Sequence, residues 1–225
     1  MKCAFLILCS MIAFDGNKTF AAEKIRILPL GDSLTEGGYN DNQQWYVAGG
    51  YRNFLKAELL KSGRAIDFVG RRKSGPVPEN DVKHEGYSGL RIDEVAPFVR
   101  EALVLFKPRI VLTILGSNDI IQNYETDSAP RRMFGLVRLI LETSPGTVIY
   151  VGSPIPTNNA GFNAKLKVYA KALEKLVKGA RDSRLRWVDM FWGAGIKNGD
   201  LIDGVHPRPS GWEKMGRTWA RALEL

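Results

Sequence analysis

The sequence predicts an α/β fold, a three-layer α/β/α sandwich with a roughly five-stranded parallel sheet. Strand-like and helix-like segments alternate along the 225 residues, and this order builds βαβ units. The clearest strand, residues 109–115, is almost unbroken apolar, which is typical of a parallel strand covered on both faces. Since βαβ crossovers are right-handed, helices are expected on both faces of the sheet.

Five short apolar segments are the candidate strands. They are residues 25–30, 66–69, 109–115, 147–151 and 185–188. Sites in such sheets form beyond the carboxyl ends of the strands. The loops that matter for function are therefore residues 31–38, 70–90, 116–124, 152–161 and 190–209.

Between the candidate strands, apolar residues recur at helical spacing. The spacing predicts helices over residues 51–60, 94–106, 131–142 and 162–177. Pro97 leaves the start of the second of these open, and Pro108 marks its end. A last helix is expected after Ser210, whose hydroxyl can cap the backbone amide three residues on while Glu213 reaches back.

The first 22 residues have the layout of a secretory signal peptide. Lys2 gives a positive start, a short apolar run follows, and small residues end the segment near Ala22. A membrane anchor is the competing interpretation, but the run is too short, because a span needs ~20 apolar residues. We therefore expect removal of residues 1–22, one folded domain over residues 23–225, no stable membrane anchor, and secretion to the extracellular space or the periplasm.

The positions of the cysteines and the net charge indicate which bonds and binding partners to expect. Both cysteines, Cys3 and Cys9, lie in the first 22 residues, so no disulfide is expected in the mature chain. Lys and Arg number 32 against 24 Asp and Glu, a formal net charge of +8. Such a charge can draw a protein to acidic polymers, although a well-solvated surface is the simpler interpretation. No nucleic-acid-binding motif accompanies the cations, so no nucleic acid partner is expected.

Four of the loops at the predicted carboxyl edge carry residues that could do chemistry. Each block alone is a weak signal, because a Gly-Asp-Ser turn or an Asn after a strand usually only orders a loop. Their joint placement at one edge of one sheet indicates a single site. The blocks are Gly31-Asp32-Ser33-Leu34-Thr35-Glu36-Gly37, Gly86-Tyr87-Ser88-Gly89, Gly116-Ser117-Asn118-Asp119 and Asp203-Gly204-Val205-His206.

These blocks, in this order, resemble those of the SGNH, or GDSL, hydrolase superfamily, and they span nearly the whole chain after residue 22. Four stretches, two of which extend these blocks, resemble carbohydrate esterase family 3, which includes many acetylxylan esterases. They are residues 31–38, 49–52, 67–70 and 84–89. The resemblance implies a flavodoxin-like SGNH hydrolase fold and a serine esterase. A Gly-x-Ser-x-Gly elbow is absent from the sequence, which argues against an α/β-hydrolase.

The resemblance assigns Ser33 as the nucleophile and His206 as the base that takes the proton of its hydroxyl. Asp203, three residues before His206, is expected to orient the imidazole and to stabilise its charged form. The other histidine of the chain, His84, is expected to order its loop. The histidine spacing fits no zinc pattern, and no calcium loop motif occurs, so we expect no metal and no cofactor.

The tetrahedral intermediate of ester hydrolysis needs hydrogen-bond donors aimed at its oxyanion. The expected donors are the backbone amides of Ser33 and Gly89 and the side-chain amide of Asn118. Glycine allows the close approach of backbone that such a pocket requires. Gly86 is the competing choice for the glycine.

Aromatic residues near the site edge are candidates for substrate binding, because flat apolar rings pack on sugar faces. The candidates are Tyr39, Trp45, Tyr87 and Trp192. Simple loop packing remains the alternative for each of them. Arg52 is expected to pair with a carboxylate of loop 31–42 or to cap a surface.

The expected activity is hydrolysis of O-acetyl esters on an acetylated polysaccharide or oligosaccharide, with xylan as the leading candidate, through an acyl-enzyme on Ser33. The same blocks serve esterases, lysophospholipases and thioesterases acting on lipid or other small acyl esters, so that alternative stays open. A non-catalytic carbohydrate-binding protein conflicts with the intact set of candidate catalytic residues. A flavodoxin-like cofactor-binding protein lacks its phosphate-cradling glycine loop. The oligomeric state is left open.

Overall fold

The computed structural model describes residues 24–42, 44–47, 49–75 and 83–223. The expected signal peptide, residues 1–22, lies outside these residues, and so do both cysteines. Within the described ranges, no helix is both long and apolar enough to cross a membrane.

A mostly parallel sheet organises these residues, and β1 (Ile25–Gly31) lies in its middle. The other strands are β4 (Ile66–Phe68), β5 (Arg72–Lys73), β6 (Lys83–Gly86), β7 (Ile110–Ile114), β8 (Val148–Gly152) and β9 (Leu185–Val188). On one side of β1, the parallel strands β7, β8 and β9 follow in order. On the other side, β4 pairs with the first part of β1 and β6 with its last two residues. The short β5 runs antiparallel to β6.

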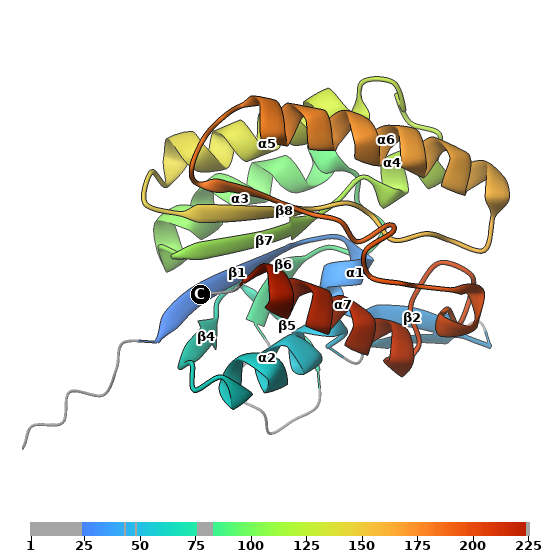
Figure 1. Ribbon diagram of the computed structural model, residues 1–225, viewed down its shortest axis with the longest axis horizontal. Coiled ribbons are helices and arrows are strands. Elements are labelled where there is room, and N and C mark those ends of the chain that lie inside the picture. The colour runs from blue at the N-terminus through green and yellow to red at the C-terminus, as the bar shows by residue number, and fades with distance from the viewer. Residues whose placement is uncertain (1–23, 43, 48, 76–82, 224–225) are drawn as a thin grey trace, which may run out of the picture.

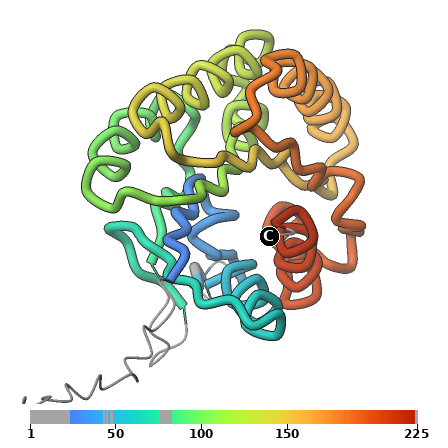
Figure 2. Tube along the Cα trace, turned by 60° about the vertical axis from the view of Figure 1, so that its left-hand side comes forward, coloured from blue at the N-terminus to red at the C-terminus, as the bar shows by residue number. Residues whose placement is uncertain are grey.

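Helices cover both faces of the sheet (Figures 1 and 2). One face carries α3 (Ile92–Phe106), α5 (Ala129–Thr143) and α6 (Ala160–Gly179), and the other carries α2 (Tyr51–Lys61) and α7 (Pro209–Ala222). The predicted α/β/α sandwich is therefore confirmed. Because β4 and β6 share one flank of β1, the sheet has about the predicted width although it contains more strands.

Side chains of β1 point alternately to the two faces of the sheet and contribute to the hydrophobic core on each face. Leu28 and Leu30 pack under α3 and α5, whereas Ile27 packs under α2 and α7. All three side chains are fully buried, and burying each stabilises the fold by roughly 1.5–3 kcal/mol. Trp212 and Trp219 of α7 are buried in the second core.

Two sequence expectations need correction. The last helix begins at Pro209, and Ser210 does not cap it: its hydroxyl donates to Asp200 Oδ1 at 2.9 Å. Proline fits the first helical position because its fixed φ suits a helix and its missing N–H would have no intrahelical acceptor. Loop 70–90 contains β5 and β6, which carry no apolar alternation that sequence reasoning could detect.

A hairpin of β2 (Gly38–Asp41) and β3 (Gln44–Val47) was also not predicted. It follows the short helix α1 (Ser33–Glu36) at the carboxyl edge of the sheet. The other short elements at this edge are α4 (Ser117–Ile121) and the 3-10 helix η1 (Asn198–Asp200). Gly31, the last residue of β1, pairs with both Gly86 and Ile114, so three strands end level and the loops that follow them meet.

Candidate active site

Ser33 begins α1 directly after β1. Asp32 precedes the helix, and its Oδ1 accepts a hydrogen bond from Leu34 N at 2.9 Å, which is a helix cap. Gly37 ends the helix with a φ of 80°, and a Cβ there would lie 2.2 Å from Gly50 N, so the turn requires glycine. This turn holds Ser33 at the sheet edge with 7% of its surface exposed.

His206 reaches Ser33 from the loop that precedes α7. Its Nε2 lies 2.9 Å from Ser33 Oγ, and its Nδ1 lies 2.7 Å from Asp203 Oδ2. Because a carboxylate only accepts hydrogen bonds, Nδ1 carries the proton and Nε2 can accept one from the hydroxyl. The fold thus joins side chains that are 173 positions apart in sequence into one hydrogen-bonded chain.

Asp203 is held by more than the imidazole. Its Oδ1 accepts from Val205 N at 3.0 Å and from His206 N at 2.7 Å, and its Oδ2 also accepts from Asn40 N of the β2–β3 hairpin at 3.2 Å. Partial burial pushes the pKa of Asp203 up, but the hydrogen bonds from the backbone and ring of His206 outweigh it and lower the pKa. Asp203 is therefore an anion that can stabilise an imidazolium.

The predicted oxyanion donors follow three neighbouring strands of the sheet. Ser33 N stands at the first helical position, where no intrahelical acceptor exists. Gly89 has a φ of 78°, and its N–H meets no acceptor in the described part of the chain. Asn118 Nδ2 donates one hydrogen to Leu90 O at 2.9 Å, and its second N–H remains available.

Gly86, the competing glycine, has another role. Its N–H donates to His84 Nδ1 at 2.9 Å. A Cβ on Gly86 would lie 2.4 Å from Glu36 N, so the glycine allows β6 to pass close to α1. Since its donor is already used, the geometry favours Gly89 for the oxyanion pocket.

We expect Asn118→Ala to lower kcat/KM by about 10²–10³, because one oxyanion donor is lost. The measurement is steady-state hydrolysis of an aryl acetate, with thermal unfolding to confirm folding. Asn123→Ala is the matched control, because that side chain is exposed and accepts a hydrogen bond from exposed Lys165 at 2.7 Å. If the two variants lost activity equally, Asn118 would have no special place in the pocket.

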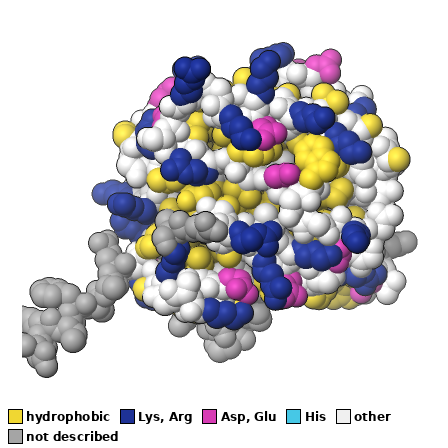
Figure 3. Space-filling view, in the orientation of Figure 1, with side chains coloured by type: hydrophobic (Ala, Val, Ile, Leu, Met, Phe, Trp, Pro, Cys, Tyr) yellow, Lys and Arg dark blue, Asp and Glu magenta, His cyan; other side chains and the backbone are white. Residues whose placement is uncertain are grey.

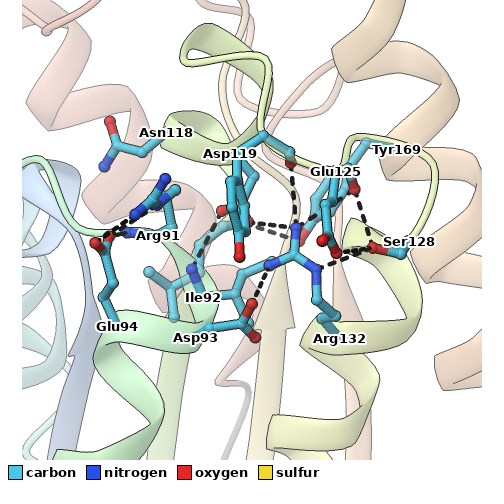
Figure 4. A network of polar contacts seen from close by, with 12 residues as sticks. Arg91, Ile92, Asp93, Glu94, Asn118, Asp119, Glu125, Ser128, Arg132 and Tyr169 are labelled. Atoms are coloured by element: carbon cyan, nitrogen blue, oxygen red, sulfur yellow. Dashed lines mark hydrogen bonds and ion pairs between the residues drawn. The ribbon is translucent and has the colours of Figure 1, made fainter.

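A network behind Asn118 was missed by sequence reasoning (Figure 4). Arg132 of α5 lies 2.7 Å from Asp119 Oδ1 and 2.8 Å from Asp93 Oδ2. Asp119 is fully buried, and its Oδ2 accepts from Ile92 N at 3.2 Å. The network therefore ties α4, which carries Asn118, to the start of α3. No motif marks Arg132, because it lies far from the four blocks in sequence.

Burial also affects the two acids next to the candidate catalytic residues. Desolvation raises the pKa of Asp32 to about 7, the bond from Leu34 N opposes this, and the charge of Asp119 adds to it. Desolvation likewise raises the pKa of Asp119, against the bond from Ile92 N and the charge of Arg132. Asp32 and Asp119 thus order backbone at the edges of the site.

His84 is a buried residue of β6, not part of a loop. Its Nδ1 accepts from Gly86 N, and its Nε2 lies 2.7 Å from Ser74 Oγ, which in turn donates to Glu36 O at 2.6 Å. Desolvation lowers the pKa of His84 to about 2, and the charges of Arg52 and Arg72 add to this. His84 is therefore neutral and connects β6 to α1.

This burial predicts acid sensitivity. Below pH 6.5 the unfolded chain protonates His84 while the folded protein does not until about pH 2, so stability falls as the pH drops through this window. At pH 5 the loss from this residue is roughly 2 kcal/mol relative to pH 8. In His84→Asn, whose side-chain oxygen can accept from Gly86 N, the free energy of unfolding in urea should fall less over this range. Equal losses in both proteins would contradict the assignment.

Arg52 is fully buried, so the expectation of a surface cap is wrong. Its guanidinium donates to Thr35 O at 3.1 Å, to Glu36 O at 3.2 Å and to Ser74 Oγ at 2.6 Å. The carboxylate of Glu36 pairs with Arg72 at 2.6 Å. Arg52 thus holds the backbone of α1 through the carbonyl groups of Thr35 and Glu36.

The aromatic candidates lie in different surroundings. Tyr39 stacks on Tyr46 across the hairpin at 5.6 Å, and Trp192 is 45% exposed beside Phe191. The ring of Tyr87 stacks on Phe98 at 4.6 Å, and its hydroxyl donates to Glu85 Oε2 at 2.5 Å. The side chain of Trp45 lies outside the described residues.

In the part of the chain that the structure covers, no three His, Cys, Asp or Glu side chains are grouped to hold a metal ion.

Comparison with known proteins shows the family to which the chain belongs. The model of the GDSL-like lipase/acylhydrolase family matches residues 30–214. The chain belongs to this family, which confirms the resemblance seen in the sequence blocks.

Among curated proteins, a multidomain esterase from Ruminococcus flavefaciens is 27% identical over 91% of this chain, and the chain spans 29% of that protein. A family 3 carbohydrate esterase from Clostridium thermocellum is 26% identical, with a TM-score of 0.74 over 88% of this chain and 94% of that one. A family 3 carbohydrate esterase from Talaromyces cellulolyticus, 24% identical, has a TM-score of 0.76 over 88% and 96% of the two chains and shares the fold.

Proposed function

We propose that this protein is a secreted serine esterase that removes acetyl groups from carbohydrate, with acetylated xylan as the substrate. The observation that carries the proposal is the 2.9 Å contact between Ser33 Oγ and His206 Nε2, backed by Asp203. The layout of residues 1–22 supports secretion, and the family 3 carbohydrate esterases among the relatives support the substrate class.

In this mechanism, Ser33 Oγ attacks the acetyl carbonyl carbon as its proton passes to His206 Nε2. The oxyanion accepts hydrogen bonds from Ser33 N, Gly89 N and Asn118 Nδ2. Collapse of the tetrahedral intermediate breaks the ester bond, and His206 gives its proton to the leaving sugar oxygen, which departs as a hydroxyl. A water, deprotonated by His206, then attacks the acetyl-enzyme. When the second tetrahedral intermediate collapses, acetate leaves and His206 returns the proton to Ser33 Oγ.

The surface beside Asp203 supports a hydroxylated substrate over a long acyl chain. A cavity of about 680 Å³ there is lined, among the described residues, by Asn40, Asp41, Asn42, Ile202, Asp203 and Arg208. All but Ile202 are polar or charged. Sugar hydroxyls can bond to such groups, whereas a lipid chain would leave them without partners.

The test compares aryl esters from acetate to long acyl chains, and acetylated xylan with other acetylated glycans and an acyl phospholipid. Highest kcat/KM for acetate, and release of acetate from xylan, are the expected results. A preference for long acyl chains would establish the lipid esterase alternative. A folded protein that an active-site serine probe does not label at Ser33 would establish a binding protein instead.

A further inference from the structure

A second cavity lies at the opposite end of the sheet, where the strands begin. It has a volume of about 560 Å³, which is within the usual range for ligand sites. The described residues that line it are Lys24, Ile25, Arg26, Lys107, Pro108, Arg109, Ser144 and Gly146. Four of these eight are cations and none is acidic. Since β1 is seven residues long, the cavity lies ~20 Å from Ser33.

The cations are brought together by strand pairing. Arg26 and Arg109 precede the first residue pair of β1 and β7, and Arg109 N donates to Arg26 O at 2.9 Å. Lys24 and Lys107 lie two positions before them, so the four charges gather at one corner of the sheet. In Figure 3, Lys and Arg side chains form a group at the left end of the molecule, where β1 begins in Figure 1.

Nothing in the described residues neutralises these charges. All four side chains are exposed, and none forms an ion pair within those residues. Many other cations of this protein are paired, such as Arg132 with Asp119 and Lys214 with Asp200. Like charges on neighbouring strands are unfavourable, so a bound anion would remove a repulsion that the described residues leave in place.

We propose that this cavity is a docking site for a polysaccharide that carries carboxylates, such as a glycan rich in uronic acid. The cations would meet the carboxylates, while Ile25 and Pro108 offer apolar surface to a sugar ring. The concave shape suits separate groups of a chain better than a flat membrane surface. Bound there, the glycan leaves the candidate catalytic edge open, so docking can raise the local concentration of substrate without blocking Ser33.

The test measures binding of the full chain to polygalacturonate by affinity electrophoresis. Arg26→Gln with Arg109→Gln should weaken binding about tenfold. Arg100→Gln with Arg131→Gln is the matched control, because it removes the same two charges from exposed positions of α3 and α5. The control should bind as wild type does, and fully methyl-esterified polygalacturonate should bind neither protein.

Equal weakening in the two double variants would reduce the effect to net charge and overturn the proposal. Tighter binding to duplex DNA or to anionic vesicles, lost in the same variant, would overturn the polysaccharide assignment. Hydrolysis of a small aryl acetate should be unchanged in both variants. Because binding is measured without turnover, failure of the proposed esterase activity and failure of this docking site are distinguishable.

Discussion

Replacing Ser33 by Ala should abolish turnover, with kcat reduced by at least about 10³ and as much as ~10⁶. Ser33 Oγ is the hydroxyl that lies 2.9 Å from His206 Nε2, so its removal takes away the proposed nucleophile for the acyl carbon. His206→Ala should cost as much, because the two residues act as a unit and the hydroxyl is unreactive without its base. The measurement is steady-state hydrolysis of an aryl acetate and of acetylated xylan.

The folding of these variants needs its own control. Ser33 Oγ is bonded only to the imidazole among described residues, so its loss should change the free energy of unfolding by about 1 kcal/mol or less. Ser62→Ala removes a hydroxyl that donates to Leu59 O at 2.8 Å, away from the site, and should keep full activity. Retained turnover in folded Ser33→Ala would remove Ser33 from its assigned role.

Asp203→Asn should lower kcat by up to ~10⁴. The backbone N–H groups of Val205 and His206 hold Oδ1 as an acceptor, so the amide NH₂ of an asparagine would face His206 Nδ1. Nδ1 would then accept, the ring proton would move to Nε2, and Nε2 could no longer take the proton of Ser33. The wrong tautomer is the main cause of the expected loss, and the variant also loses the acceptor for Asn40 N.

The division of the effect between kcat and KM in the same variant gives a second measurement. Since Asp203 is an anion in the wild type, its charge stabilises the imidazolium, and the Asn variant lacks that charge. Asp203→Asn should therefore lower kcat while KM changes little. A variant within tenfold of wild type would show that Ser33 and His206 suffice as a dyad.

The periodicity of apolar residues was enough to predict the three layers of this fold. The near-continuous apolar run of β7 and the helical stripe of α6 depend on local pattern alone, and both were predicted. The hairpin β2–β3 was missed although its strands pair with each other, because they show no clear apolar alternation. Strand β6 was missed because it pairs with β1, which lies far away along the chain. Buried His84 is an example: its ring nitrogens are satisfied by Gly86 N and Ser74 Oγ, which no periodicity reveals.

For the candidate site, motif blocks predicted Ser33, Asn118, Asp203 and His206, whereas the contacts of the supporting residues were not predicted. Arg132 belongs to no motif, and Arg52 lies in one of the stretches that resemble family 3, but the sequence did not show that their guanidinium groups contact Asp119 and the backbone of α1. Long side chains of this kind act at sites distant in sequence from their own positions. Their contacts are therefore set by the packing of α5 and α2 against the rest of the molecule.

By itself, the sequence determined the order of strands and helices, the residue types for acyl chemistry, and their places at the ends of strands. Only the tertiary structure decided which nitrogen of His206 faces Ser33, which glycine N–H is available, and which cations gather at the far end of the sheet. The physical reason is range: periodicity and short motifs report contacts between near neighbours in the chain. Hydrogen-bond geometry, burial and charge clustering depend on segments that meet only when the sheet is assembled.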